Sequence, residues 1–68
     1  MIKSYESARA IGQDRANRMH NVMYLYHLDE GYYLSSIFER PFVFEQFYDR
    51  IKKIEDIYPQ EEQGSEAT

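Results

Sequence analysis

The aromatic residues are the feature that most constrains how this chain can fold. Its 68 residues include seven tyrosines and four phenylalanines, most of them between Tyr24 and Tyr58. Each aromatic side chain can bury about 150–250 Å², whereas a domain of this size buries only about 60% of its unfolded surface. We therefore expect uncovered aromatic surface. A homodimer or a complex with another protein is favoured over a monomer with a closed aromatic core.

The composition removes two common ways of stabilising so small a domain. The chain has no cysteine, so neither disulfides nor thiolate zinc sites can reinforce it. The two histidines, His20 and His27, would stand about 10.5 Å apart along a helix, too far to hold one ion together. The sequence predicts no metal and no cofactor, which leaves association as the remaining route to stability.

No sequence pattern here predicts catalysis. All three glycines are isolated, so there is no phosphate-binding loop or dinucleotide fingerprint, and Ser35 and Ser36 lie in no nucleophile elbow. A chain this short can hardly enclose a pocket in which two carboxylates act as acid and base. We expect a non-catalytic protein. Because no apolar signal segment and no run of 18 apolar residues occurs, we also expect a cytoplasmic protein that does not enter the membrane.

Charge is divided unevenly along the chain. The formal net charge is −4, with +2 over residues 1–20 and −6 over residues 21–68. This distribution argues against a nucleic-acid binder with a uniformly basic surface. Two nucleic-acid alternatives stay open. Arg9, Arg15 and Arg18 could contact phosphates, or the acidic second half could mimic nucleic acid in a basic cleft.

Residues 4–28 have the pattern of one long helix, with Ser4 as a suitable N-cap. One stripe of the helical wheel holds Tyr5, Ala8, Gly12, Ala16, Met19, Met23 and Tyr26. The small residues Ala8, Gly12 and Ala16 form with Met19 a helix-packing groove, in which a helix of this chain or of a partner could pack closely. Arg15 falls within the same stripe, among Ala8, Gly12 and Met19, and is expected to pair with a carboxylate of the C-terminal helix or across an interface.

Residues 22–38 allow a second interpretation. Two runs rich in apolar and aromatic residues, 22–28 and 32–38, flank Asp29, Glu30 and Gly31. A three-residue loop ending in glycine suits a β-hairpin with a bulge, although glycine equally suits the residue after a helix end. Because β-branched residues are few and Met and Leu favour helices, we favour the helix and keep the hairpin as the alternative.

The segment 44–58 has the clearest helical pattern. Apolar residues recur there at spacings of 3, 4, 3 and 4: Phe44, Phe47, Ile51, Ile54 and Tyr58. The predicted fold is therefore mainly α, with a long N-terminal helix antiparallel to a C-terminal amphipathic helix in one domain of residues 1–58. The alternative is α+β, a helix, a β-hairpin and a helix. Residues 59–68 contain no large apolar side chain and are predicted to be a disordered acidic tail.

The predicted contact surface is aromatic, because Tyr and Phe are enriched in interface cores and Tyr and Arg are frequent hot spots. Tyr32 and Tyr33 are adjacent and so must point in different directions, and Phe42 falls outside the 44–58 pattern, which predicts exposed ring surface. The candidate protein-binding residues are Arg15, Tyr24, Tyr26, Tyr32, Tyr33, Phe38 and Phe42. We expect a regulator or adaptor that docks on a larger protein, in the style of small bacterial or phage inhibitors.

Overall fold

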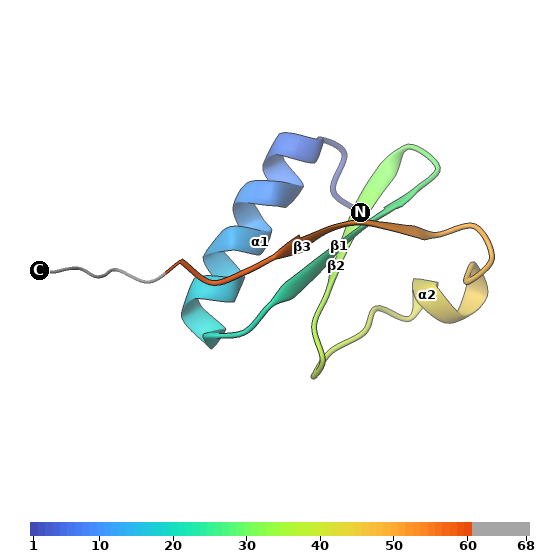
Figure 1. The fold of residues 1–68 in the computed structure, drawn as a ribbon. Coiled ribbons are helices and arrows are strands. Elements are labelled where there is room, and N and C mark those ends of the chain that lie inside the picture. The colour runs from blue at the N-terminus through green and yellow to red at the C-terminus, as the bar shows by residue number, and fades with distance from the viewer. Residues whose placement is uncertain (61–68) are drawn as a thin grey trace, which may run out of the picture.

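The computed structural model describes residues 1–60, which form two helices and a three-stranded antiparallel sheet (Figure 1). The elements follow in the order α1 (Tyr5–Met19), β1 (Met23–Leu28), β2 (Gly31–Ser35), α2 (Val43–Gln46) and β3 (Lys52–Ile57). The prediction of a mainly α fold is wrong, and the α+β alternative describes the chain better. From residue 61 onward, the predicted disordered tail lies outside the described residues.

Helix α1 begins as the sequence predicts but ends much earlier than residue 28. The hydroxyl of Ser4 accepts a hydrogen bond from the backbone N–H of Ser7 at 3.1 Å, as an N-cap should. At the other end His20 adopts left-handed backbone angles, φ 55° and ψ 42°, and its N–H bonds to the carbonyl of Ala16. This left-handed residue turns the chain out of the helix, so residues 23–28 are free to form a strand.

Strands β1 and β2 form the hairpin that the sequence offered as its alternative. Leu25 pairs with Leu34, and the closing pair is Leu28 with Gly31. The turn therefore has two residues, not three, and Asp29, at φ 56°, takes the left-handed position instead of the glycine. Asp tolerates this conformation better than most residues because its short side chain can bond locally.

The segment 44–58 is not one helix. Only Val43–Gln46 is helical, and Lys52–Ile57 pairs antiparallel with β1, which gives the strand order β2-β1-β3. The apolar residues of the predicted pattern do not share one face: Phe44 is buried, whereas Ile54 and Tyr58 are exposed. Strand pairing with β1 satisfies the backbone groups of residues 52–57 that face β1, and Ile57 is completely buried. These tertiary contacts outweigh the local helical period.

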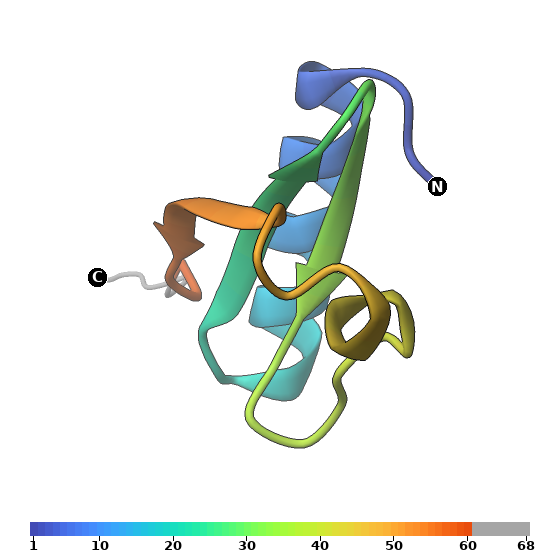
Figure 2. The same ribbon diagram turned by 90° about the vertical axis from the view of Figure 1, so that its right-hand side faces the viewer.

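The core lies between α1 and one face of the sheet, and in Figure 2 the helix passes behind the strands. Ala8, Gly12 and Ala16 are buried there, so the predicted packing groove along α1 is filled by the sheet of the same chain. A Cβ atom on Gly12 would lie 2.6 Å from Cδ1 of Ile57 and 2.9 Å from Cδ2 of Leu34. Met19, also assigned to that groove, lies exposed at the end of the helix.

Candidate protein-binding surface

The face of the sheet opposite α1, called here the open face, carries side chains that the strand alternation turns away from the core. Met23 and Leu25 of β1 are buried toward α1, so Tyr24 and Tyr26 between and after them point to the open face. Their cross-strand neighbours on β2 are Ser35 and Tyr33. The open face is therefore built mainly from tyrosine rings and a serine hydroxyl.

Helix α2 covers part of this open face. The ring of Phe44, only 2% exposed, meets the ring of Tyr26 edge-on, with centroids 4.4 Å apart. The guanidinium of Arg40 lies 5.3 Å from the Phe44 centroid, a cation–π contact from the preceding chain. These contacts fix the connection between β2 and β3 against the sheet at one point and leave the neighbouring surface hollowed.

Beside that contact is a groove of about 370 Å³. Its lining comes from β1, from the end of β2 and from the residues that follow: Tyr24, Tyr26, Ser35, Ser36, Ile37, Phe38, Glu39 and Arg40. The volume lies near the lower end of the range typical of small-molecule sites, about 300–1,000 Å³. The groove is thus large enough to receive a side chain from another molecule.

One wall of the groove is a short loop held by serine hydroxyls, residues 36–39, called here the anchor loop. The Ser36 hydroxyl accepts hydrogen bonds from the N–H groups of Phe38 and Glu39, each at 3.1 Å. The Ser36 N–H and the Ser35 hydroxyl both donate to the Glu39 carbonyl, at 2.8 and 3.0 Å. With its backbone bonded in this way, the loop turns Ile37 and Phe38 outward, where they are 64% and 71% exposed.

Further rings are exposed along the same connection. Phe42 and Tyr48 are 72% and 75% exposed, so residues 37–48, called here the apolar connection, present four large apolar side chains to solvent. Beyond its far end Arg50 donates to both carboxylate oxygens of Asp29, at 2.7 and 2.8 Å, which ties the chain to the hairpin turn. The connection is thus fastened at both ends, and its exposed rings extend from an ordered backbone.

The structure brings some of the predicted contact residues together and separates others. Tyr24, Tyr26 and Phe38 line the groove, and Phe42 lies on the apolar connection that borders it. Tyr32 and Tyr33 point to opposite faces, as their adjacency requires, and both are half-buried.

Tyr32, Tyr33 and Arg15 do not line the groove. The ring of Tyr32 stacks on His27 with centroids 4.8 Å apart and meets Tyr5 of α1 edge-on at 6.1 Å, which places it on the helix side of the sheet. Arg15 is exposed on α1. Within residues 1–60 no carboxylate forms an ion pair with Arg15, and the pair that joins α1 to the third strand is made by Arg9 and Glu55.

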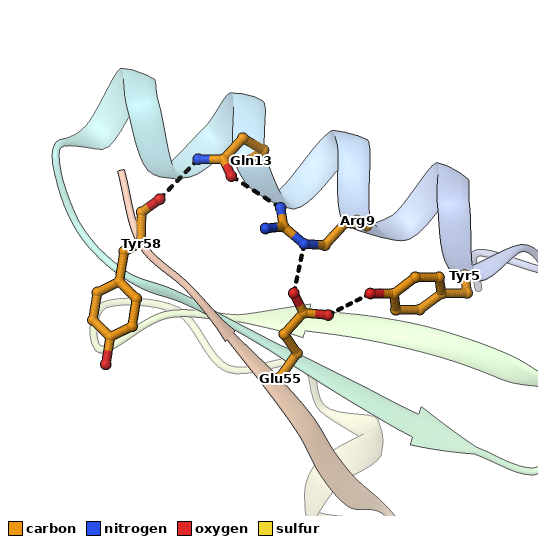
Figure 3. A network of polar contacts seen from close by, with 5 residues as sticks. All are labelled: Tyr5, Arg9, Gln13, Glu55 and Tyr58. Carbon is orange, nitrogen blue, oxygen red and sulfur yellow. Dashed lines mark hydrogen bonds and ion pairs between the residues drawn. The ribbon is translucent and has the colours of Figure 1, made fainter. Parts of the chain in front are cut away.

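Two of the three arginines of α1 pair with carboxylates of the same chain, and Figure 3 shows the pair between Arg9 and Glu55. Arg9 donates to Oε2 of Glu55 at 2.6 Å, while the hydroxyl of Tyr5 donates to Oε1 of the same carboxylate at 2.6 Å. Arg18 pairs with Asp14 one helical turn away. The guanidinium groups of Arg9 and Arg18 are therefore already paired with carboxylates of this chain. The three arginines proposed for phosphate contact do not form one set that is free to bind phosphates.

The polar network around Glu55 fastens α1 to β3. The hydrogen bond from Tyr5, with that from Arg9, lowers the pKa of Glu55 against the opposing effect of burial, and the same bond raises the pKa of Tyr5. Gln13 extends the network by donating to the Tyr58 carbonyl at 2.8 Å.

On the open face, hydrogen bonding and attraction to Asp56 raise the pKa of Lys53, whose ammonium lies 5.2 Å from the Tyr24 centroid.

Sequence reasoning missed several residues of the groove and of the apolar connection: Ser35, Ser36, Ile37, Glu39, Arg40 and Tyr48. In the sequence, residues 32–38 form what looks like one apolar run, whereas in the structure β2 ends at Ser35. The available signal was the serine pair, since serine hydroxyls commonly bond to the backbone N–H groups that follow them in turns.

Residues 1–60 contain no group of three or more His, Asp or Glu side chains placed to hold a metal ion. The same part of the chain has no helix long and apolar enough to cross a membrane. The chain matches no protein-family model, and neither the curated proteins nor the solved structures contain a match to it.

Proposed function

We propose that this protein is a non-catalytic regulator or adaptor that binds another protein chain through the apolar connection and the adjoining groove. The observation that carries this proposal is the exposure of Phe38 and Phe42, each more than 70% accessible in a domain with a small core. Clustered exposed rings are a feature of interaction sites, and monomeric soluble proteins rarely leave large apolar patches uncovered.

The anchor loop adds a reason for binding to be favourable. Burying one exposed phenylalanine ring contributes about 2–3 kcal/mol before the cost of association. Part of that cost is the ordering of flexible segments at the interface. Because the backbone around Phe38 is already held by the hydroxyls of Ser35 and Ser36, less ordering remains to be done on binding.

The proposal is tested by placing a photo-reactive cross-linking amino acid at Phe38 or Phe42, in the cells that naturally produce the protein. Residue Ala10, exposed on α1, is the matched control position. We expect a discrete cross-linked protein at positions 38 and 42 and none at position 10. Equal adducts at all three positions, or none at 38 and 42, would contradict a binding role for this surface.

A further inference from the structure

A projecting loop and a hollow lie side by side on this surface. Ile37 and Phe38 form one wall of the groove and yet remain mostly exposed, so their side chains extend beyond the groove and do not fill it. The groove of about 370 Å³ is open to solvent and is lined by Tyr24 and Tyr26 on one side and by polar residues such as Ser36 and Glu39 on the other, so it has room for a phenylalanine ring packed against the two tyrosines. A surface that carries both shapes can pair with a copy of itself about a two-fold axis, because each projection then meets the opposite hollow.

The charges of residues 1–60 permit such pairing. Residues 1–60 carry eight Lys and Arg against nine Asp and Glu, and the remaining three carboxylates are Glu61, Glu62 and Glu66. Two copies therefore meet with little net repulsion from the part that forms the surface. At the groove itself Glu39 and Arg40 are neighbours, so a two-fold arrangement can place opposite charges near each other.

The available apolar area is of the right order for a dimer. The four exposed side chains of the apolar connection are 64–75% accessible, which corresponds to roughly 500 Å² if an aromatic side chain has about 150–250 Å². A standard interface buries about 800 Å² on each partner, including a polar rim. Two-fold symmetry also doubles every contact, so each anchor side chain contributes twice.

Pairing through the strand edges is disfavoured by the structure. The β2 edge is occupied at Tyr32 by Ile2, whose N–H and carbonyl both bond to it, at 3.2 and 2.7 Å. The β3 edge carries Lys52 and Lys53 and an irregular register beside Leu25 and Tyr26, and both lysines and bulges hinder edge-to-edge pairing. Edge-to-edge pairing therefore does not compete with pairing through the groove and the apolar connection.

We propose that the partner is a second copy of this chain, bound about a two-fold axis so that Phe38 of each copy enters the groove beside Tyr24 of the other. The inference rests on the proposed function, because it names the protein that the apolar connection binds. It requires that each contact be made by Phe38 of one copy and the groove of the other copy.

Sedimentation equilibrium and velocity test the assembly. The unmodified chain is expected to be a dimer at ~100 µM. Phe38→Ser removes the projection and Tyr24→Thr removes the groove wall, and each is expected to weaken dimerisation by at least about 100-fold, because a hot-spot residue is lost from both copies. Circular dichroism checks that each variant keeps its fold. Ile11→Gln, which replaces an exposed apolar residue on α1, is expected to dimerise normally.

A mixing experiment separates reciprocal insertion from simple apolar adhesion. The Phe38→Ser chain retains the β1 side of its groove, Tyr24 and Tyr26, and loses only the Phe38 part of the opposite wall. The Tyr24→Thr chain retains the Phe38 projection. A mixture of the two should form a heterodimer through one restored contact, whereas neither variant alone should dimerise. A mixture that stays as monomeric as its components overturns the reciprocal arrangement.

The two proposals fail differently. If the unmodified chain is monomeric at ~100 µM while cross-linking at Phe38 captures a protein of another mass, the second copy is excluded as partner and the binding function stands. A monomer that also gives no adduct at positions 38 and 42 overturns both. A dimer weakened by Ile11→Gln and unaffected by Phe38→Ser places the interface on α1 and overturns the inference.

Discussion

Gly12 sets how closely α1 approaches the sheet. An exposed helical glycine replaced by alanine usually gains up to about 1 kcal/mol in stability. Here the added methyl group meets the packed side chains of Ile57 and Leu34 at 2.6 and 2.9 Å. Gly12→Ala is therefore expected to lower the free energy of unfolding by about 1–3 kcal/mol through overpacking, measured by urea titration. Arg15→Ala, on the exposed side of the helix, should change it by less than about 0.5 kcal/mol. A more stable Gly12→Ala variant would show that α1 does not lie against the sheet at this position.

Glu55 joins two residues of α1 to β3, and its contribution should depend on pH. Because its pKa is lowered in the folded chain from the usual 4.5, the unfolded chain binds the proton first as the pH falls. The stabilisation is therefore present above pH 4.5 and is lost as the pH falls through the folded pKa. Glu55→Gln should cost roughly 1 kcal/mol at pH 7, and the difference from the unmodified chain should shrink below pH 4.5.

Thermal unfolding between pH 7 and pH 3 measures this difference for Glu55→Gln. The variant Glu30→Gln serves as the control, because Glu30 lies exposed at the hairpin turn and belongs to no bond with α1. A difference between Glu55→Gln and the unmodified chain that stays constant over the whole pH range would mean that the carboxylate does not fasten the helix.

Among the elements, the end of α1 depends on a residue that is strained there. His20 holds φ 55°, a left-handed conformation that costs a residue with a Cβ about 1–2 kcal/mol. Glycine avoids this cost, but it loses more backbone entropy on folding, which offsets part of the gain. His20→Gly should therefore raise the free energy of unfolding by about 0.5–1 kcal/mol. Ala10→Gly, within the same helix, should lower it by about 1 kcal/mol. If both glycine variants lose stability to the same extent, the helix does not end at this residue.

Local sequence patterns identify some elements and miss others for a physical reason. The cap at Ser4 and the stripe Ala8, Gly12 and Ala16 identify α1, because capping and helical period depend only on neighbouring residues. The pattern of residues 44–58 misleads, because an apolar spacing of three and four does not specify what each side chain packs against. In the folded chain Phe44 packs on Tyr26 and Ile57 packs under α1, on opposite faces of the sheet.

The molecule as a whole should show its association in its stability. If folded chains dimerise and unfolded chains do not, dilution shifts the equilibrium toward unfolding. The Tm of the unmodified chain should therefore rise by roughly 5 °C over a 100-fold increase in concentration. The Tm of Phe38→Ser should not change over the same range, and calorimetry or circular dichroism measures both. A Tm of the unmodified chain that is independent of concentration would count against the dimer.

The sequence by itself determined where α1 starts, which of its faces is buried, and that residues 22–38 could pair about a loop at residues 29–31. Each of these follows from contacts between residues near one another in the chain. Only the tertiary structure decided that α1 stops at Met19, that residues 52–57 form a strand and that Tyr32, not Tyr33, is the one that faces α1. A strand acquires its hydrogen bonds from a neighbour such as β1, whose edge is available only once the rest of the chain has folded.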